Sequence, residues 1–450
     1  MDKDFVLNYL KVKNYWWTTG RIDEKDKGLE RPEYVSAIEG SFSIERIIAL
    51  SGLRRSGKTT ILFQIIDDLV KKNDPRNIVY FKMDDLMDKA EDIHEVIKAY
   101  SELTGKDPLK DELYFFIDEI HVMKNWQTHL KYYIDSHAKS KYVVSGSSKT
   151  LLYKDASESL AGRIKFIDVF PLTFREFITF SGTKIRNTAD FQNPEEVKKL
   201  YYDILEHKEK ILHLFNEYLE VGGFPEWFKI KNYNTWQKTL EDYLSIILFK
   251  DIVTVFNIKD PILLEKLVKE TAKESTNRFS YLNLSNRLDT DRSNIKTYLY
   301  YLRTSMLIYI SESYTKNKTA NERKEKKIYF WEEGLRKAIT LDTDPAKAVE
   351  NIVAWHLTKK GSESKIFYSP YYWKDKYEID YVYDDGKSNI PIEVKYGAQI
   401  PDTELRSLKE YSKEHNPKKA MVITRDTLET RQINGVTVYL IPAWLFLLTI

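Results

Sequence analysis

The most informative absence in this chain is that of cysteine, which occurs at none of its 450 positions. Disulfides and zinc-thiolate sites are therefore excluded, and a chain without cysteine is typical of a reducing, intracellular compartment. The amino terminus also lacks the basic segment and apolar core of a signal peptide. No apolar run approaches the roughly 20 residues that span a bilayer. We therefore expect a cytoplasmic protein that does not enter a membrane.

A strong excess of either charge is missing as well, because 70 basic residues face 68 acidic ones and the formal net charge is +2. This balance neither supports nor excludes nucleic-acid binding, since a local basic patch can lie within a neutral total. Hydrophobic residues make up 42% and charged residues 31%, which is typical of a globular chain. A chain of this length is expected to hold about two to four domains.

What the chain does contain is a phosphate-binding loop. The stretch S-G-L-R-R-S-G-K-T-T at residues 51–60 fits G-x-x-x-x-G-K-[ST]. Glycines let the backbone wrap a polyphosphate, and the helix that follows offers its positive end to the same anion. Lys58 is expected to reach the β and γ phosphates of ATP, and the Thr59 hydroxyl to bind Mg²⁺. The predicted ATP-binding residues of the loop are Gly52, Leu53, Arg54, Arg55, Ser56, Gly57, Lys58, Thr59 and Thr60.

A second motif ends an apolar strand. The run E-L-Y-F-F-I-D-E-I at residues 112–120 contains Asp118 and Glu119 near its carboxyl end. A continuous apolar run suits a strand buried on both faces of a parallel sheet, and ligands bind at the carboxyl ends of such strands. Asp118 is predicted to bind the nucleotide's Mg²⁺, and Glu119 to orient or polarise the attacking water. The alternative is an ordinary strand that ends in two surface acids.

Two further candidates lie downstream, and each has a structural alternative. In K-Y-V-V-S-G-S-S at residues 141–148, Ser147 or Ser148 either senses the γ-phosphate or caps the helix that follows. Arg163 either stabilises charge on the transferring phosphoryl group, in cis or toward a neighbouring subunit, or is a surface arginine.

The segments G-L-R-R-S-G-K-T-T, F-F-I-D-E-I, S-G-S-S, S-L-A-G-R and P-L-T-F-R-E-F together resemble prokaryotic AAA+-related ATPases with a nuclease-like C-terminal domain. V-G-G-F-P-E, F-K-D-I-V and K-I-Y-F-W-E-E-G-L extend the resemblance over nearly the whole chain. It implies an α/β fold: a P-loop NTPase with a parallel sheet and flanking helices, then a helical lid, a winged helix and a PD-(D/E)xK-like α/β domain. The expected boundaries are residues 1–180, 181–261, 262–335 and 336–450. Related ATPases often need a neighbour's arginine, so the resemblance is compatible with a homo-oligomer.

Residues 262–335 show helices followed by two strand-like runs, in the order of a winged helix. If this segment binds DNA, Arg292, Asn294 and Lys296 would face the major groove. The charged loop between the strands would then contact phosphates through Lys316, Lys318, Arg323, Lys324 and Lys326. The alternative is a spacer whose charged loop is merely solvated.

Residues 336–450 contain the second set of candidate catalytic residues. Glu350 lies in an expected helix, Asp380 within an apolar strand, and Glu393 and Lys395 on the next strand, where a period of two makes them point the same way. This ordered set resembles the PD-(D/E)xK nuclease fold. The resemblance implies that Asp380 and Glu393 coordinate Mg²⁺ or Mn²⁺, that Glu350 completes the site, and that Lys395 positions the hydrolytic water. A degenerate copy of the fold that does not cleave is the alternative.

These motifs predict an Mg²⁺-dependent ATPase whose nucleotide state controls an attached DNA-directed nuclease domain, so that ATP and DNA are its expected partners. The alternative hypothesis is a regulatory or binding protein. In that case ATP drives assembly or partner recognition, and the C-terminal fold only docks nucleic acid or protein.

Overall fold

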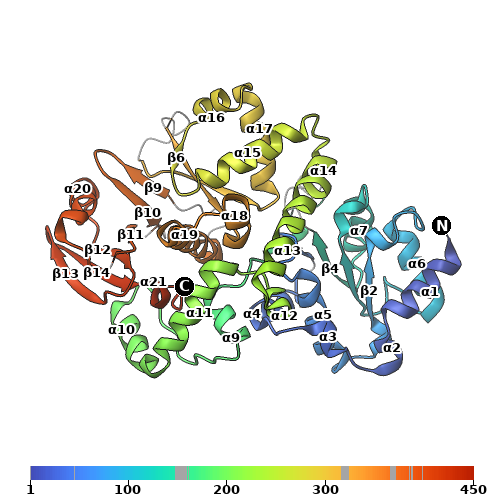
Figure 1. Cartoon of the computed structure of the whole chain (residues 1–450). Coiled ribbons are helices and arrows are strands. Elements are labelled where there is room, and N and C mark those ends of the chain that lie inside the picture. Colours follow the sequence, from blue (N-terminus) through green and yellow to red (C-terminus); the bar gives the residue numbers. More distant parts are fainter. Residues whose placement is uncertain are drawn as a thin grey trace. The chain divides into compact units, whose positions relative to one another are not determined.

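The computed structural model describes residues 2–44, 46–146, 160, 162–315, 324–364, 371–384, 386, 389–397 and 399–450 (Figure 1). Five of the candidate residues named above lie outside these ranges: Ser147, Ser148, Lys316, Lys318 and Arg323.

The chain forms two compact units. The first consists of Met1–Phe170 with Thr304–Met306, and the second of Pro171–Arg303 with Leu307–Ile450.

The first unit is built on a five-stranded parallel sheet with the order β2-β3-β4-β1-β5. Successive residues of β1 point to opposite faces: Ile47 and Ala49 enter one apolar core, and Ile48 and Leu50 enter the other. A strand buried on both faces requires a continuous apolar run, which explains the sequence pattern. The strands are β1 (Ile47–Ser51), β2 (Ile78–Lys82), β3 (Tyr114–Asp118), β4 (Lys141–Gly146) and β5 (Ile164–Asp168).

Helices cover both faces of this sheet. They are α1 (Lys3–Lys13), α2 (Trp16–Thr19), α3 (Glu24–Lys27), α4 (Pro32–Glu39), α5 (Lys58–Val70), α6 (Ile93–Thr104) and α7 (Trp126–Asp135). Helix α5 turns Ile61, Leu62, Ile65 and Ile66 into the same core as Ile48, because apolar residues three and four apart share one helical face. The predicted α/β class, a parallel sheet with flanking helices, is confirmed for this unit.

The outer edge of β2 is closed by side chains from the amino-terminal segment. Both indole N–H groups of Trp16 and Trp17 donate to the Ile78 carbonyl, at 3.1 and 2.8 Å. Asn14 binds Tyr80 twice: its Oδ1 accepts from the backbone N–H at 2.6 Å, and its amide donates to the carbonyl at 2.9 Å. An exposed strand edge invites pairing with another chain, so these side chains protect the sheet.

The second unit begins with helices that pack through aromatic side chains, among them Phe174, Phe177 and Tyr218. They are α9 (Phe174–Phe180), α10 (Pro194–Asp203), α11 (Lys208–Val221), α12 (Trp227–Ile230) and α13 (Tyr233–Ser245), which continues through a π-helical stretch (Ile246–Val253) into α14 (Thr254–Phe256). The next helices are α15 (Pro261–Lys273), α16 (Tyr281–Arg287), α17 (Arg292–Thr304), α18 (Glu333–Thr340) and α19 (Pro345–Ser364), and later α20 (Arg406–His415) and α21 (Ala443–Phe446).

The strands of the second unit form one nine-stranded mixed sheet with the order β13-β14-β12-β11-β10-β9-β7-β8-β6. They are β6 (Arg278–Phe279), β7 (Ile308–Ser313), β8 (Lys326–Phe330), β9 (Tyr371–Lys374), β10 (Glu378–Asp384), β11 (Asn389–Lys395), β12 (Lys419–Thr424), β13 (Glu429–Ile433) and β14 (Val436–Pro442). The helices and hairpin follow the order expected of a winged helix, an assignment that stays a prediction. The hairpin joins the remaining strands through parallel pairing of β7 with β9. A single sheet therefore contains strands from both sides of residue 335, where a boundary between domains was expected.

Candidate functional site

The backbone between β1 and α5 has the conformation that a phosphate-binding loop requires. Gly57 has φ of 98° and Arg55 has φ of 70°, so the chain passes twice through the left-handed region before α5 begins. At Gly52 a Cβ atom would lie 2.2 Å from the carbonyl oxygen of Val169, which follows β5. Glycine is therefore needed at position 52 for packing and at position 57 for backbone conformation.

Lys58 lies inside this loop. Its side chain is buried, and its ammonium donates to the carbonyl oxygens of Gly52 and Leu53 at 3.0 and 3.2 Å. The other predicted ATP contacts differ in exposure: Ser56 is buried, Arg54 and Thr60 are half-buried, and Arg55 and Thr59 are exposed. The loop thus presents both a cationic side chain and the first turn of α5 where a polyphosphate would bind.

The two predicted magnesium ligands of the nucleotide site meet. Thr59, in the first turn of α5, donates from Oγ1 to Asp118 Oδ2, at the carboxyl end of β3, over 2.7 Å. Asp118 has no exposed surface, and it also accepts from the Tyr80 hydroxyl at 3.0 Å and from the Ser145 hydroxyl. A hydroxyl and a carboxylate are hard oxygen donors, so these residues fit Mg²⁺.

Glu119 leaves the strand in a left-handed conformation, with φ of 50° and ψ of 41°. Its backbone N–H donates to the Ser145 hydroxyl at 3.2 Å. Its carboxylate lies 3.3 Å from the Nδ1 atom of His121, and both side chains are largely buried. The turn therefore directs Glu119 away from the axis of β3, with an imidazole beside its carboxylate.

Three residues of this site were missed from the sequence. Tyr80 and Ser145 come from β2 and β4, the strands on either side of β3, and both bind Asp118. Arg31 is buried, stacks on Tyr34 with its guanidinium 4.5 Å from the ring centre, and donates to the Ser56 carbonyl at 3.0 Å. The feature of the sequence that could have identified some of them is a polar residue inside an apolar run, such as the serine in Y-V-V-S-G.

The expectation that Arg163 acts on the phosphoryl group of its own chain is wrong. Arg163 precedes β5, and its carbonyl accepts from the N–H of Ile47, the first residue of β1. It therefore lies at the amino ends of the parallel strands, whereas Asp118 lies at a carboxyl end. Its guanidinium pairs with Asp135 at 2.6 Å on the surface. A role toward a neighbouring subunit stays a prediction.

In the second unit, the four predicted nuclease residues come from three neighbouring elements. Glu350 lies on α19, Asp380 on β10, and Glu393 and Lys395 on β11. The Asp380 carboxylate accepts from the backbone N–H of Val394 at 2.9 Å, and the Lys395 ammonium lies 2.7 Å from Glu393. Glu393 and Lys395 thus share one face of β11, and Asp380 lies against that strand.

Burial changes the acidity of two of these carboxyl groups. Desolvation raises the pKa of Glu350 to about 8, and the charge of Asp380 adds to this shift. Desolvation likewise raises the pKa of Glu393 to about 7, although the neighbouring Lys395 acts in the opposite direction. The Ser407 hydroxyl donates to Glu393 Oε2 at 2.5 Å.

Lys327 of β8 pairs with Glu350 and Asp380, although the sequence had indicated no role for it in this site. Its ammonium lies 3.1 Å from Glu350 Oε1, 2.7 Å from Glu378 Oε1 and 3.1 Å from Asp380 Oδ1. Desolvation acts to lower the pKa of Lys327, but the carboxylates, Glu350 foremost, outweigh it and raise that pKa. Lys327 is therefore a charged ammonium among acids. The feature of the sequence that could have indicated this role is a lysine next to an apolar strand, in the run K-I-Y-F.

These residues do not fit the divalent cation expected at the nuclease-like site. Among the described residues, no group of three or more acidic, histidine or cysteine side chains is arranged to hold a metal ion. Glu350 and Asp380 direct one oxygen each at the Lys327 ammonium, and the second oxygen of Asp380 accepts from Val394. The oxygens that would bind a metal thus already accept hydrogen bonds.

The expected DNA-contacting residues of α17 are on the surface. Arg292, Asn294 and Lys296 are exposed, and the Lys296 ammonium lies 5.5 Å from the ring centre of Tyr281. Lys324 is exposed as well. Lys326 is buried at 7% exposure, so its expected phosphate contact is wrong: it begins β8, where the chain has already entered the sheet.

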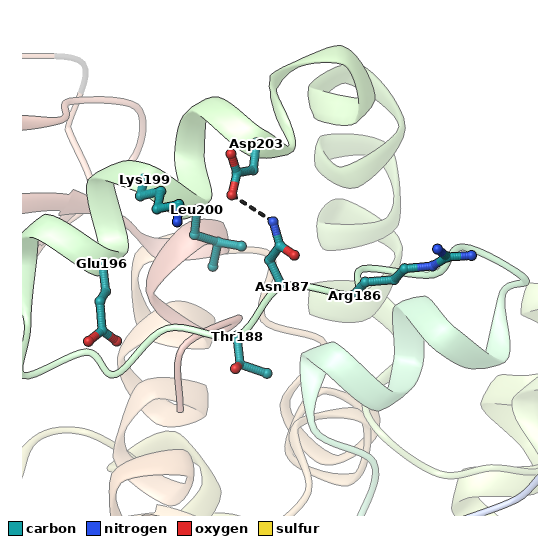
Figure 2. A pocket seen from close by; sticks show the side chains of 7 residues that line it. All are labelled: Arg186, Asn187, Thr188, Glu196, Lys199, Leu200 and Asp203. Atoms are coloured by element: carbon teal, nitrogen blue, oxygen red, sulfur yellow. Dashed lines mark hydrogen bonds between the residues drawn. The ribbon is translucent and has the colours of Figure 1, made fainter.

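A cavity of about 350 Å³ in the second unit contains none of the predicted site residues (Figure 2). Across it, the Asn187 amide donates to the Asp203 carboxylate at 2.6 Å. Its lining consists of Arg186, Asn187, Thr188, Glu196, Lys199, Leu200 and Asp203. Because charges of both signs line it, the cavity favours neither anions nor cations.

Three family models match parts of the chain, and one of them falls largely on the first unit. Residues 44–178 match an AAA domain, and residues 212–346 and 346–446 match two domains of unknown function. With the parallel sheet and the P-loop geometry, the AAA match supports an AAA-like P-loop ATPase of the archaeal and bacterial kind, and hence ATP binding. No helix among the described residues has the length and apolar content needed to cross a bilayer.

Similar chains occur in archaea and bacteria. The uncharacterized protein MJ1544 of Methanocaldococcus jannaschii is 27% identical over 82% of this chain and 78% of its own length. An uncharacterized protein of Haemophilus influenzae is 25% identical over 93% of this chain and 98% of its own. Among solved structures, the Walker-type ATPase PABY2304 of Pyrococcus abyssi has a TM-score of 0.43 and 14% identity over 69% of this chain and 95% of its own.

Proposed function

We propose that this chain binds ATP with Mg²⁺ at the P-loop of its first unit and hydrolyses it. The proposal rests on one contact, the 2.7 Å hydrogen bond between Thr59 Oγ1 and Asp118 Oδ2, which brings a hydroxyl and a carboxylate together from different elements. Magnesium bound there neutralises charge that develops on the phosphates.

The chain's own residues supply the remaining functions. The first turn of α5 binds the phosphates through backbone N–H groups, and Lys58 adds a positive charge from within the loop. Glu119 orients the attacking water and accepts its proton. The neighbouring His121 imidazole, whose Nδ1 lies 3.3 Å from the Glu119 carboxylate, helps to position that carboxylate. These roles are the ones that in-line attack on a terminal phosphate requires.

Two variants test this proposal. Lys58→Ala should abolish tight ATP binding, whereas Glu119→Gln should bind ATP and hydrolyse it about 10²- to 10⁴-fold more slowly. Glu112→Gln is the matched control, because Glu112 precedes the same strand at its other end and binds the Tyr114 hydroxyl. Unchanged binding in Lys58→Ala would place the nucleotide elsewhere. Parental turnover in Glu119→Gln would assign the proton acceptor to another residue.

We further propose that the nucleotide state controls the second unit, through contacts that the γ-phosphate makes only before hydrolysis. Two activities of that unit are compatible with its sequence: metal-dependent cleavage of DNA, or docking of nucleic acid or protein without cleavage. The Lys327 ammonium among Glu350, Glu378 and Asp380 favours docking, because it lies where the acids would hold a metal.

Incubation of the purified protein with plasmid DNA and Mg²⁺ or Mn²⁺ separates the two activities. Docking predicts no nicking beyond that of the variants Glu393→Ala and Lys395→Ala. Nicking by the parent that disappears in both variants would establish cleavage instead. The protein should also bind the plasmid less tightly when Arg292 and Lys296 are both replaced by alanine. Each of these two replacements removes an exposed positive charge from α17.

A further inference from the structure

Lys327 is among the least exposed charged residues of the second unit. Only 1% of its side chain is accessible, although it carries a full positive charge. A buried ammonium is costly unless its charge is paired and its N–H groups are hydrogen-bonded. An ammonium has three donors. Here it donates to Glu350 and Asp380 at 3.1 Å each, and a third carboxyl group, that of Glu378, lies 2.7 Å from the nitrogen. The buried ammonium is therefore paired with three carboxyl groups.

Two of these carboxyl groups, those of Asp380 and Glu350, belong to the set expected to hold a divalent cation, whose third member is Glu393. An ion held by Glu350 Oε1 and Asp380 Oδ1 would have to share both oxygens with the Lys327 ammonium. Both oxygens are 3.1 Å from the Lys327 nitrogen. A metal ion there would consequently lie near a buried ammonium and compete with it for the same oxygens. Two positive charges that close, out of water, repel each other strongly.

The other carboxyl groups around Lys327 are also paired with cationic side chains. Glu378 also pairs with Arg278 of β6 at 2.8 Å, and Glu393 pairs with Lys395 at 2.7 Å. Arg278 also pairs with Glu325, so five carboxyl groups in this region are paired with three cationic side chains. Each carboxyl group that could bind a dication there is thus already paired with a cationic side chain.

We propose that the Lys327 ammonium takes the place of the divalent cation in this cluster. The cluster is thus a metal site in which a side chain of the same protein is the permanent cation. Glu350 and Asp380 supply carboxyl oxygens of the kind that bind such an ion, and a divalent ion can bind to them only when Lys327 is removed. This inference deepens the docking activity proposed for the second unit. It does not depend on ATP hydrolysis, which takes place in the first unit.

Titration of the nucleotide-free, full-length protein with Mn²⁺ tests this, because free Mn²⁺ is measured directly by electron paramagnetic resonance. The variant Lys327→Met keeps an unbranched chain and removes the charge. It should bind one Mn²⁺ more than the parent does, with an affinity at least about tenfold higher than that of the parent for this cluster. The additional ion should disappear in the double variant Lys327→Met with Asp380→Asn.

Lys337→Met is the matched control, since Lys337 is also nearly buried but pairs with a single carboxylate, that of Glu220, at 2.7 Å. It should bind no additional Mn²⁺. A folded Lys327→Met protein that gains no ion would overturn the inference. If Lys327→Met does not fold, Mn²⁺ binding by the parent is compared with binding by Asp380→Asn. Equal binding by the two proteins supports the inference. An ion that the parent binds and Asp380→Asn does not bind refutes it. Lys58→Ala, which disables the proposed nucleotide site, should leave all these results unchanged.

Discussion

Replacing Asn14 by alanine tests whether side chains can complete the edge of a parallel sheet. Asn14 has no exposed surface, and its amide group satisfies both the N–H and the carbonyl of Tyr80 on the outer side of β2. It also donates to the Leu10 carbonyl at 2.8 Å, within α1. Alanine would therefore leave two buried backbone groups of β2 without partners.

The cost of this change can be worked out from these bonds. A buried polar group that loses its partner costs about 1 to 3 kcal/mol, so two such groups cost about 2 to 6 kcal/mol. Loss of the bond to the Tyr80 N–H alone corresponds to an increase of about 5- to 150-fold in the population of the open form. Asn73 provides a matched control, because its amide makes a single bond, to the Leu69 carbonyl at 2.9 Å, and is only partly buried.

Hydrogen exchange followed by mass spectrometry measures the effect locally, without requiring the two units to unfold together. Asn14→Ala should accelerate exchange in the peptide that contains β2 by at least about fivefold, while exchange in β8 of the other unit stays the same. Asn73→Ala should leave β2 unchanged. Equal exchange of β2 in Asn14→Ala and in the parent would refute the edge-closing role of Asn14.

Two other outcomes follow from buried polar residues. His356 accepts from the Phe174 N–H at 3.2 Å, and burial lowers its pKa from 6.5 to about 3. The stability that it provides is therefore complete above pH 6.5 and is lost as the pH falls. Denaturant unfolding should show a loss of about 2 kcal/mol between pH 6.5 and about pH 5, which His356→Gln removes. Arg31→Met removes the donor to the Ser56 carbonyl in the loop, so ATP should bind about tenfold more weakly in a fluorescence titration, with parental turnover once saturated.

The nucleotide site was predictable where its chemistry is local in sequence. Gly52, Gly57, Lys58 and Thr59 lie within one loop, and their spacing alone determines which atoms can face a phosphate. Asp118 could be added because a buried strand that ends in an acid indicates the ligand-binding edge of a parallel sheet. Contacts between neighbouring strands were not predictable in this way. Which hydroxyls reach Asp118 depends on strand order, which no local pattern encodes.

Strand order also explains the two errors. Arg163 lies near Asp118 only if its strand runs the other way; in the observed parallel pairing, Ile164 aligns with Ile47, at the amino end of β1. Lys326 appeared to belong to a charged loop because lysine and glutamate dominate the sequence around it. In the structure it pairs with Phe279 of β6 and is buried. A segment rich in lysine and glutamate is therefore exposed to solvent only where it lies outside a sheet.

The continuity of the nine-stranded sheet has a functional consequence for the second unit. Pairing of Ser313 with Tyr372 joins the hairpin that carries Lys327 to the strands that carry Asp380 and Glu393. Helix α19 packs on β8, β10 and β11, so its Glu350 reaches both parts. The hairpin cannot separate from the acids without breaking the backbone pairing of β7 with β9 and exposing the buried charge of Lys327. If the nucleotide controls this unit as proposed, the β7–β8 hairpin and the acidic cluster would therefore move together.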